Sequence, residues 1–191
     1  MSRQIRRRFL ASVVALAGSS VLPVGIAIAH TPYGQWDSFR KRHLQVLTAR
    51  SDLTGDAIAD SWVALLAEHL PRSKAVVSRA RNFVRVASLL KTDQAKLAVL
   101  SYQQAEAMFS AEAPFEDFSP MPLQLLIDDG NYLLVCRDDL PLEHGFLLAA
   151  TLLEEAAALS VSVPLSGMFG MTVHPGARAA ALGEQIIPGE E

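Results

Sequence analysis

Two short segments carry the side chains best suited to holding an anion. Each follows an apolar run typical of a buried strand, and arginine can clamp a carboxylate through paired hydrogen bonds. If the two strands are parallel neighbours, these side chains converge beside a helix N-terminus, whose free N–H groups and dipole favour an anion. The segments therefore predict a carboxylate site made of Thr48, Arg50, Ser51, Arg79, Arg81 and Asn82.

The same residues also have a purely structural interpretation. Arg79 and Arg81 can be solvated charges that pair with Asp52 or Glu106, while Ser51 only caps a helix. The two interpretations differ in whether the guanidinium groups stay available to a ligand.

The elements that would position these residues form a strand–helix–strand–helix–strand series. Strands are expected at 44–48, 74–78 and 97–100, with helices at 54–70 and 83–90. The apolar stripe of the first helix would contain Ile58, Trp62, Leu65, Leu66 and His69. Such alternation predicts an α/β fold with a parallel sheet and right-handed crossovers, whose ligands lie off the carboxyl ends of the strands.

The second half of the chain predicts further strands that join the same sheet and further helices that flank it. The sheet is therefore expected to be parallel or mixed. A proline-bearing loop at 113–122 marks a seam between the halves. Asp128–Asn131 predicts either a hairpin or a bend between separate elements. The remaining expected elements are strands at 123–127 and 132–137, a helix at 143–159, a linker at 160–171 and a last short helix ending at Leu182.

Composition favours one ordinary domain and argues against nucleic-acid binding. The chain has 191 residues, half of them apolar, and a formal net charge of −3. Four of its 17 basic residues fall in the first 29 positions, leaving 13 basic against 20 acidic residues in the remainder. The single cysteine, Cys136, lies within a strand-like run and is expected to be a buried, inert thiol.

The N-terminus has the pattern of an export signal. Arg6–Leu10 matches the core of a twin-arginine motif, an apolar region follows, and Ala27-Ile28-Ala29 fits a cleavage site. We therefore expect residues 1–29 to be a signal peptide and residues 30–191 to form a periplasmic domain. The alternative is an uncleaved membrane anchor.

Cleavage there would make His30 the first mature residue. Its amino group and imidazole can chelate copper, with His43 as a further nitrogen ligand, although His30 can equally be no more than the cleavage point. No cofactor or protein-held metal is otherwise expected. No enzyme is expected either, because nucleophile turns, phosphate loops and paired metal ligands are missing from the sequence. The adjacent acids Asp128/Asp129 and Asp138/Asp139 are expected to be solvated turns, and His174 to be structural.

Three stretches resemble one known family. They are Ala87–Leu90 leading to Ala95–Leu100, Tyr132–Pro141, and Val173–Ala177 with its His-Pro-Gly-Ala segment. In this order they are similar to the TAXI-type periplasmic solute-binding proteins, the receptors of tripartite (TRAP) carboxylate transporters. The resemblance implies one lobe of a type II periplasmic binding protein, with most of the second lobe missing, and a carboxylate or amino-acid-like ligand.

Two functions follow as hypotheses. The first is a periplasmic binding protein for a small anionic solute, serving a membrane transporter or sensor. The second is an accessory protein that binds a partner, in which the loop from Phe115 to Met121 or a homodimer covers the apolar strip left by the missing lobe.

Overall fold

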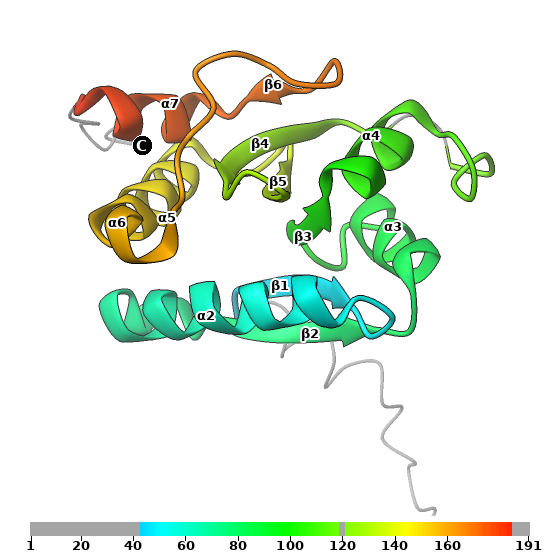
Figure 1. Ribbon diagram of the computed structural model, residues 1–191, viewed down its shortest axis with the longest axis horizontal. Coiled ribbons are helices and arrows are strands. Elements are labelled where there is room, and N and C mark those ends of the chain that lie inside the picture. Colours follow the sequence, from blue (N-terminus) through cyan, green and yellow to red (C-terminus); the bar gives the residue numbers. More distant parts are fainter. Residues whose placement is uncertain (1–42, 119–120, 185–191) are drawn as a thin grey trace, which may run out of the picture. The chain divides into compact units, whose positions relative to one another are not determined.

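The computed structural model describes residues 43–118 and 121–184. Its first half alternates strands and helices, as the apolar pattern predicts (Figure 1). These elements are β1 (Gln45–Ala49), α2 (Leu53–His69), the 3-10 turn η1 (Pro71–Ser73), β2 (Val76–Ala80), α3 (Phe83–Lys91), β3 (Leu97–Ser101) and α4 (Tyr102–Ser110). The second half adds β4 (Leu123–Asp128), β5 (Tyr132–Arg137), α5 (Leu142–Glu154), α6 (Ala156–Leu159), β6 (Thr172–Val173) and α7 (Pro175–Leu182).

One six-stranded sheet joins the two halves, in the order β2-β1-β3-β5-β4-β6. β1 is parallel to both β2 and β3, as expected, whereas β5 runs antiparallel to β3 and β4. The segment Asp128–Asn131 is therefore a hairpin turn, in which Gly130 supplies a φ of 92°. The protein is α/β with a single mixed sheet flanked by helices, which is consistent with one lobe of a binding-protein-like fold.

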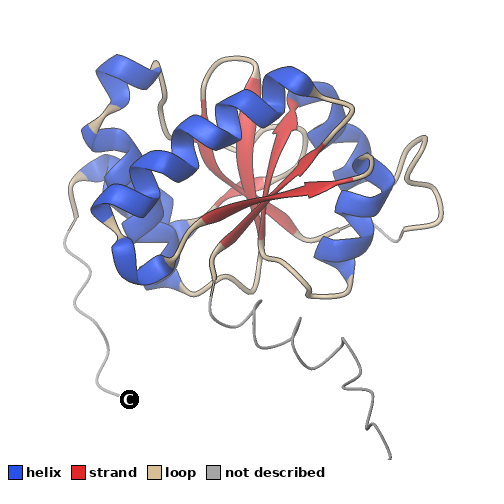
Figure 2. Cartoon of the chain, turned by 90° about the horizontal axis from the view of Figure 1, so that it is seen from below, coloured by secondary structure: helices blue, strands red, loops and turns tan. Residues whose placement is uncertain are grey.

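Helices cover both faces of this sheet (Figure 2). Successive residues of β1 point to opposite faces, so Val46 joins one apolar cluster and Leu47 the other. The first cluster includes α2, α5 and α7, and the second includes α3 and α4. Phe115 and Met121 are buried in the second cluster, so their loop covers part of that face from within the chain.

The buried stripe of α2 differs in part from the prediction. Trp62 and Leu66 are buried as expected, but His69 is exposed, and Ala59 and Val63 are buried. The stripe therefore follows the side of the helix that packs on the sheet and leaves its last residue in solvent.

Two element boundaries also needed correction. β2 begins two residues later than predicted, because η1 ends at Ser73 and its C-cap residue, Lys74, lies in the left-handed region with a φ of 47°. The long helix predicted at 143–159 is interrupted at Glu155 (φ −103°, ψ 17°), which separates α5 from α6.

Several sequence predictions concern residues beyond these elements or single side chains. The export signal and His30 lie outside the described residues. Cys136 is fully buried in β5 and its burial raises the pKa of the thiol, as expected for an inert cysteine. No helix in the described part of the chain is long and apolar enough to cross a membrane.

Candidate functional site

The carboxyl ends of β1 and β3 form a topological switch point. The chain leaves β1 into α2 on one face of the sheet and leaves β3 into α4 on the other. The register between β1 and β2 sets Thr48 opposite Arg79, and the Arg50 N–H donates to the Ala80 carbonyl at 2.9 Å. The predicted anion-binding residues of the first two strands are therefore brought to one edge, as the sequence analysis expected.

Three of these six side chains are already bonded within the protein. The Arg79 guanidinium binds Asp56 at 2.9 Å and Asp60 at 2.6 Å, and the buried Thr48 hydroxyl donates to Asp56 at 2.9 Å. The hydrogen bond to Asp56 raises the pKa of Arg79. Burial alone would raise the pKa of Asp56, but the bonds from Arg79 and Thr48 outweigh it and the pKa is lowered. Arg79 is thus paired as the structural interpretation expected, with Asp56 and Asp60 in place of Asp52 or Glu106.

Side-chain oxygens of the protein also occupy the nearby helix N-termini. Asp52, and not Ser51, caps α2 by accepting from the Gly55 N–H at 3.0 Å, and it also accepts from the Tyr132 hydroxyl at 2.9 Å. Asn82 caps α3 by accepting from the Arg85 N–H at 2.9 Å. These oxygens take the place that an anionic ligand would need.

Arg50 and Arg81 remain as the exposed cations of this edge. No ion pair within the described residues involves either side chain, and Ser51 is likewise exposed. Of the six predicted residues, Thr48, Arg79 and Asn82 are therefore engaged internally, while Arg50, Ser51 and Arg81 are not.

The hairpin between β4 and β5 adds further carboxylates to the same end of the sheet. Asp128 accepts from the Tyr102 hydroxyl at 2.6 Å, and burial together with this bond raises the pKa of Tyr102 to about 12. Asp129 accepts from the backbone N–H groups of Asn131 and Tyr132 at 2.9 and 2.6 Å. These acids organise the turn, as its sequence suggested, although both are partly buried.

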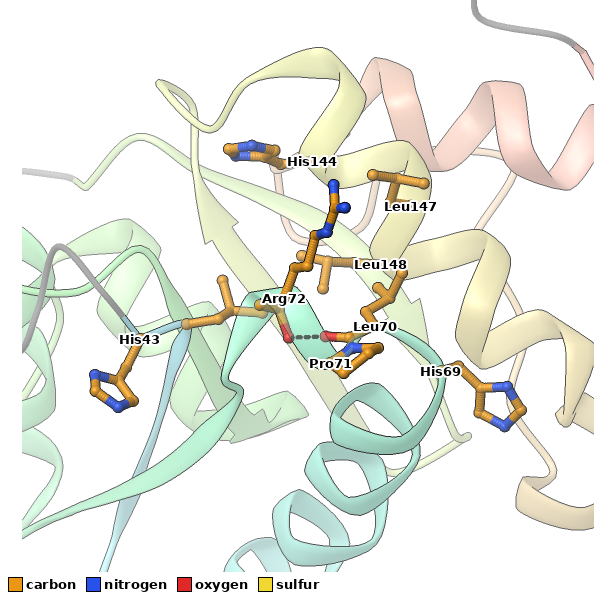
Figure 3. Close-up of a pocket in the computed structure, with 10 residues that line it drawn as sticks. His43, His69, Leu70, Pro71, Arg72, His144, Leu147 and Leu148 are labelled. Carbon is orange, nitrogen blue, oxygen red and sulfur yellow. Dashed lines mark hydrogen bonds between the residues drawn. The ribbon is translucent and has the colours of Figure 1, made fainter.

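The amino end of the sheet is hollowed, and its chemistry is different. A cavity of about 640 Å³ opens between the start of β1, the end of α2, η1 and α5 (Figure 3). Its lining residues are His43, Leu44, His69, Leu70, Pro71, Arg72, Ser73, His144, Leu147 and Leu148. Among these described residues there is no carboxylate, and the walls are largely leucine and proline. We refer to this space as the apolar cavity.

The local sequence explains why Arg72 faces this cavity. Pro71 ends α2 and opens η1, and the Ser73 hydroxyl donates to the Leu70 carbonyl at 2.6 Å, which tightens the turn. The Arg72 side chain then extends toward the turn of α5 that carries His144 and Leu147 (Figure 3). A guanidinium beside leucine side chains suits an anion that carries an apolar body.

A second cavity of about 650 Å³ adjoins the first, and we refer to it as the polar cavity. Lys96 bonds Asp93 and Asp139 at 2.6 Å each, and Arg137 bonds Asp139 at 2.9 Å. The hydrogen bond from Arg137, together with the weaker effect of the one from Lys96, lowers the pKa of Asp139 to about 2. Two cations and two anions therefore balance one another in and beside this cavity.

His174 holds part of the wall of the polar cavity in place through hydrogen bonds. Its Nδ1 accepts from the Gly176 N–H at 3.1 Å, so its Nε2 carries the proton and donates to the Leu140 carbonyl at 3.0 Å. Burial lowers the pKa of this histidine despite the bond to Leu140. The predicted structural role of His174 is confirmed, since it holds Leu140 and Pro141, both of which line the polar cavity.

The sequence did not single out Arg72 or His144. The available signal was a proline at each of two helix boundaries. Pro71 follows the first long helix and stands next to Arg72, and Pro141 precedes the helix that begins with the turn carrying His144. No group of three or more His, Cys, Asp or Glu side chains placed to hold a metal ion occurs in the described residues. The copper hypothesis stays untested, because His30 lies outside that part of the chain. Comparison with protein-family models and with curated proteins finds no match to this chain.

Proposed function

We propose that this protein binds a small organic anion in the apolar cavity at the amino end of its sheet. The observation that carries the proposal is the lining of that cavity, which combines Arg72 and three histidines with leucine walls and no described carboxylate. At the opposite end, Asp52 already caps α2, and Asp56 and Asp60 already pair with Arg79, so within the described part of the chain only Arg50, Ser51 and Arg81 of the predicted anion-binding residues stay unengaged. We therefore still propose anion binding, as the sequence suggested, but at the amino end of the sheet and not at the carboxyl end.

The setting of this function is also a proposal. The twin-arginine pattern of Arg6–Leu10 supports export to the periplasm, and the resemblance to TAXI-type receptors supports a non-catalytic protein that serves a transporter or sensor. The loop with the buried Phe115 covers part of the sheet face on which α3 and α4 pack. This covering weakens the case for a partner protein or a homodimer on that face.

Calorimetric titration with octanoate and octanamide tests the site. We expect octanoate to bind and octanamide to bind at least about tenfold more weakly, because only the carboxylate can form charge-assisted hydrogen bonds. Arg72→Ala should weaken octanoate binding by about tenfold, and Arg72→Lys should restore only part of it because lysine lacks the fork of donors.

Arg85→Ala is the matched control, since it removes an exposed arginine of α3 outside both cavities. A tenfold loss on Arg50→Ala or Arg79→Ala, with Arg72→Ala unchanged, would return the site to the carboxyl end.

A further inference from the structure

The two cavities at the amino end share part of their lining. His43, Leu44 and His144 border both the apolar and the polar cavity. The two cavities are therefore adjacent, and the residues that they share lie just before β1 and in the first turn of α5. A ligand that contacts these three residues borders both spaces.

The two spaces differ in what they can accept. The apolar cavity has leucine and proline walls, which favour a hydrocarbon body. The polar cavity is lined by Gln45, Thr92 and Gln94, of which the Gln94 amide donates to the Thr92 hydroxyl at 2.8 Å, and by the Lys96 ion pairs. Because its charges are already paired, it favours a neutral hydrogen-bonding group over a second charge.

The junction is where a carboxylate is best placed. Arg72 extends from η1 toward the α5 turn that carries His144, and His144 borders both cavities (Figure 3). A carboxylate at this junction would direct one substituent of its neighbouring carbon into the apolar cavity and another into the polar cavity.

We infer that the two cavities form one bipartite site for an organic acid that has an apolar chain and a neutral polar group on the carbon next to its carboxylate. This inference rests on the proposed function. The ligand class is that of 2-hydroxy acids and N-acyl amino acids with apolar side chains. A simple fatty acid fills the apolar half alone.

The test compares calorimetric titrations of octanoate and 2-hydroxyoctanoate. The wild-type protein should bind 2-hydroxyoctanoate at least about fivefold more tightly, since the hydroxyl gains hydrogen-bond partners in the polar cavity. The double variant Gln45→Ala/Gln94→Ala should lower this affinity ratio to about one. Arg85→Ala, outside both cavities, should keep the wild-type ratio. Circular dichroism checks that each variant is folded.

The outcomes separate this inference from the proposed function. Equal affinities in the wild-type protein, or a preference that survives the double variant, would overturn the bipartite site. If octanoate still binds and still depends on Arg72, the proposed anion site stands. If neither acid binds, both proposals fail.

Discussion

Arg79 at the carboxyl end of the sheet and Arg72 at the amino end differ in what surrounds their guanidinium groups. At the carboxyl end, Arg79 is held by two aspartates of α2, and further acids cap or brace the neighbouring turns. At the amino end, Arg72 stands beside leucines in a cavity with no described carboxylate. Arg79 is therefore a weaker candidate than Arg72 for holding an anionic ligand, because the protein already supplies the anions that pair with Arg79.

The comparison also shows how each end is supported. The carboxyl end is braced by side-chain bonds such as those between Tyr132 and Asp52 and between Tyr102 and Asp128. The amino end depends on close packing of α5 on α7, where Gly145 lies directly against the His174 ring. Stability should respond more to packing changes at the amino end than to hydrogen-bond changes at the carboxyl end.

Gly145→Ala should have the largest effect. Its new Cβ would collide with the His174 ring, which is buried and bonded on both nitrogens. We expect a loss of about 3 kcal/mol in the free energy of unfolding, measured by urea denaturation. The comparison variant is Gly130→Ala in the hairpin at the carboxyl end, which meets no atom within 4 Å but has a φ of 92°. It should cost only about 1 kcal/mol, and equal losses would contradict the assignment of close packing to the amino end.

His174→Asn tests the same support by its pH dependence. Asparagine can still cap α7 but cannot also reach Leu140, so we expect a loss of about 2 kcal/mol near neutral pH. In the wild type the folded-state pKa is lowered from 6.5, so the unfolded chain binds the proton first. The stabilisation is therefore complete above that value and declines as the pH falls below it. The difference in unfolding free energy between wild type and variant should be larger at about pH 7.5 than at about pH 5.5; a constant difference would show that His174 does not titrate in this way.

Much of the fold was open to prediction because its signals are local. The alternation of apolar runs and caps from β1 to β3 predicts these elements in order, and β5 was predicted with its observed bounds. The hairpin alternative at Asp128–Asn131 could not be decided from the turn alone. It depends on β5 pairing with both β3 and β4, which only the assembled sheet determines.

The candidate site was less accessible to sequence reasoning. Asp56 and Asp60 lie one helical turn apart on α2, but nothing local shows that both face Arg79 on β2. The apolar cavity is assembled from three separate segments, and His43 and His144 are 101 positions apart. Spacing along the chain does not predict which of these distant segments come together in the folded protein.

Asp56→Asn measures the brace at the carboxyl end. It removes one partner of Arg79 and weakens the acceptor of the buried Thr48 hydroxyl, so we expect a loss of about 1.5 kcal/mol in urea denaturation. Asp60→Asn, whose side chain is 55% exposed, should cost under about 0.5 kcal/mol. Neither change should alter octanoate affinity; tighter binding in Asp56→Asn would indicate that the released Arg79 can take the ligand.

Asp139→Asn should have a small effect. The side chain is 43% exposed, so solvent screening limits the loss to under about 1 kcal/mol, and added salt should reduce it further. Its folded pKa is lowered from 3.8 to about 2. The stabilisation is therefore present above the ordinary value and is lost as the pH falls through about 2. Denaturation of wild type and variant should converge in strong acid, and a difference that persists there would exclude this ion pair as the cause.

The most direct test of the anion site is a two-dimensional NMR titration of the isotope-labelled protein with octanoate. We predict that the resonances of Leu44, Leu70, Arg72, Leu147 and Leu148 move in a saturable manner, because these residues line the apolar cavity. The amides of Arg50, Ser51, Arg81 and Asn82 should stay in place. Saturable shifts confined to these four residues, with the leucines unmoved, would contradict the amino-end site and place the anion at the carboxyl ends of the strands.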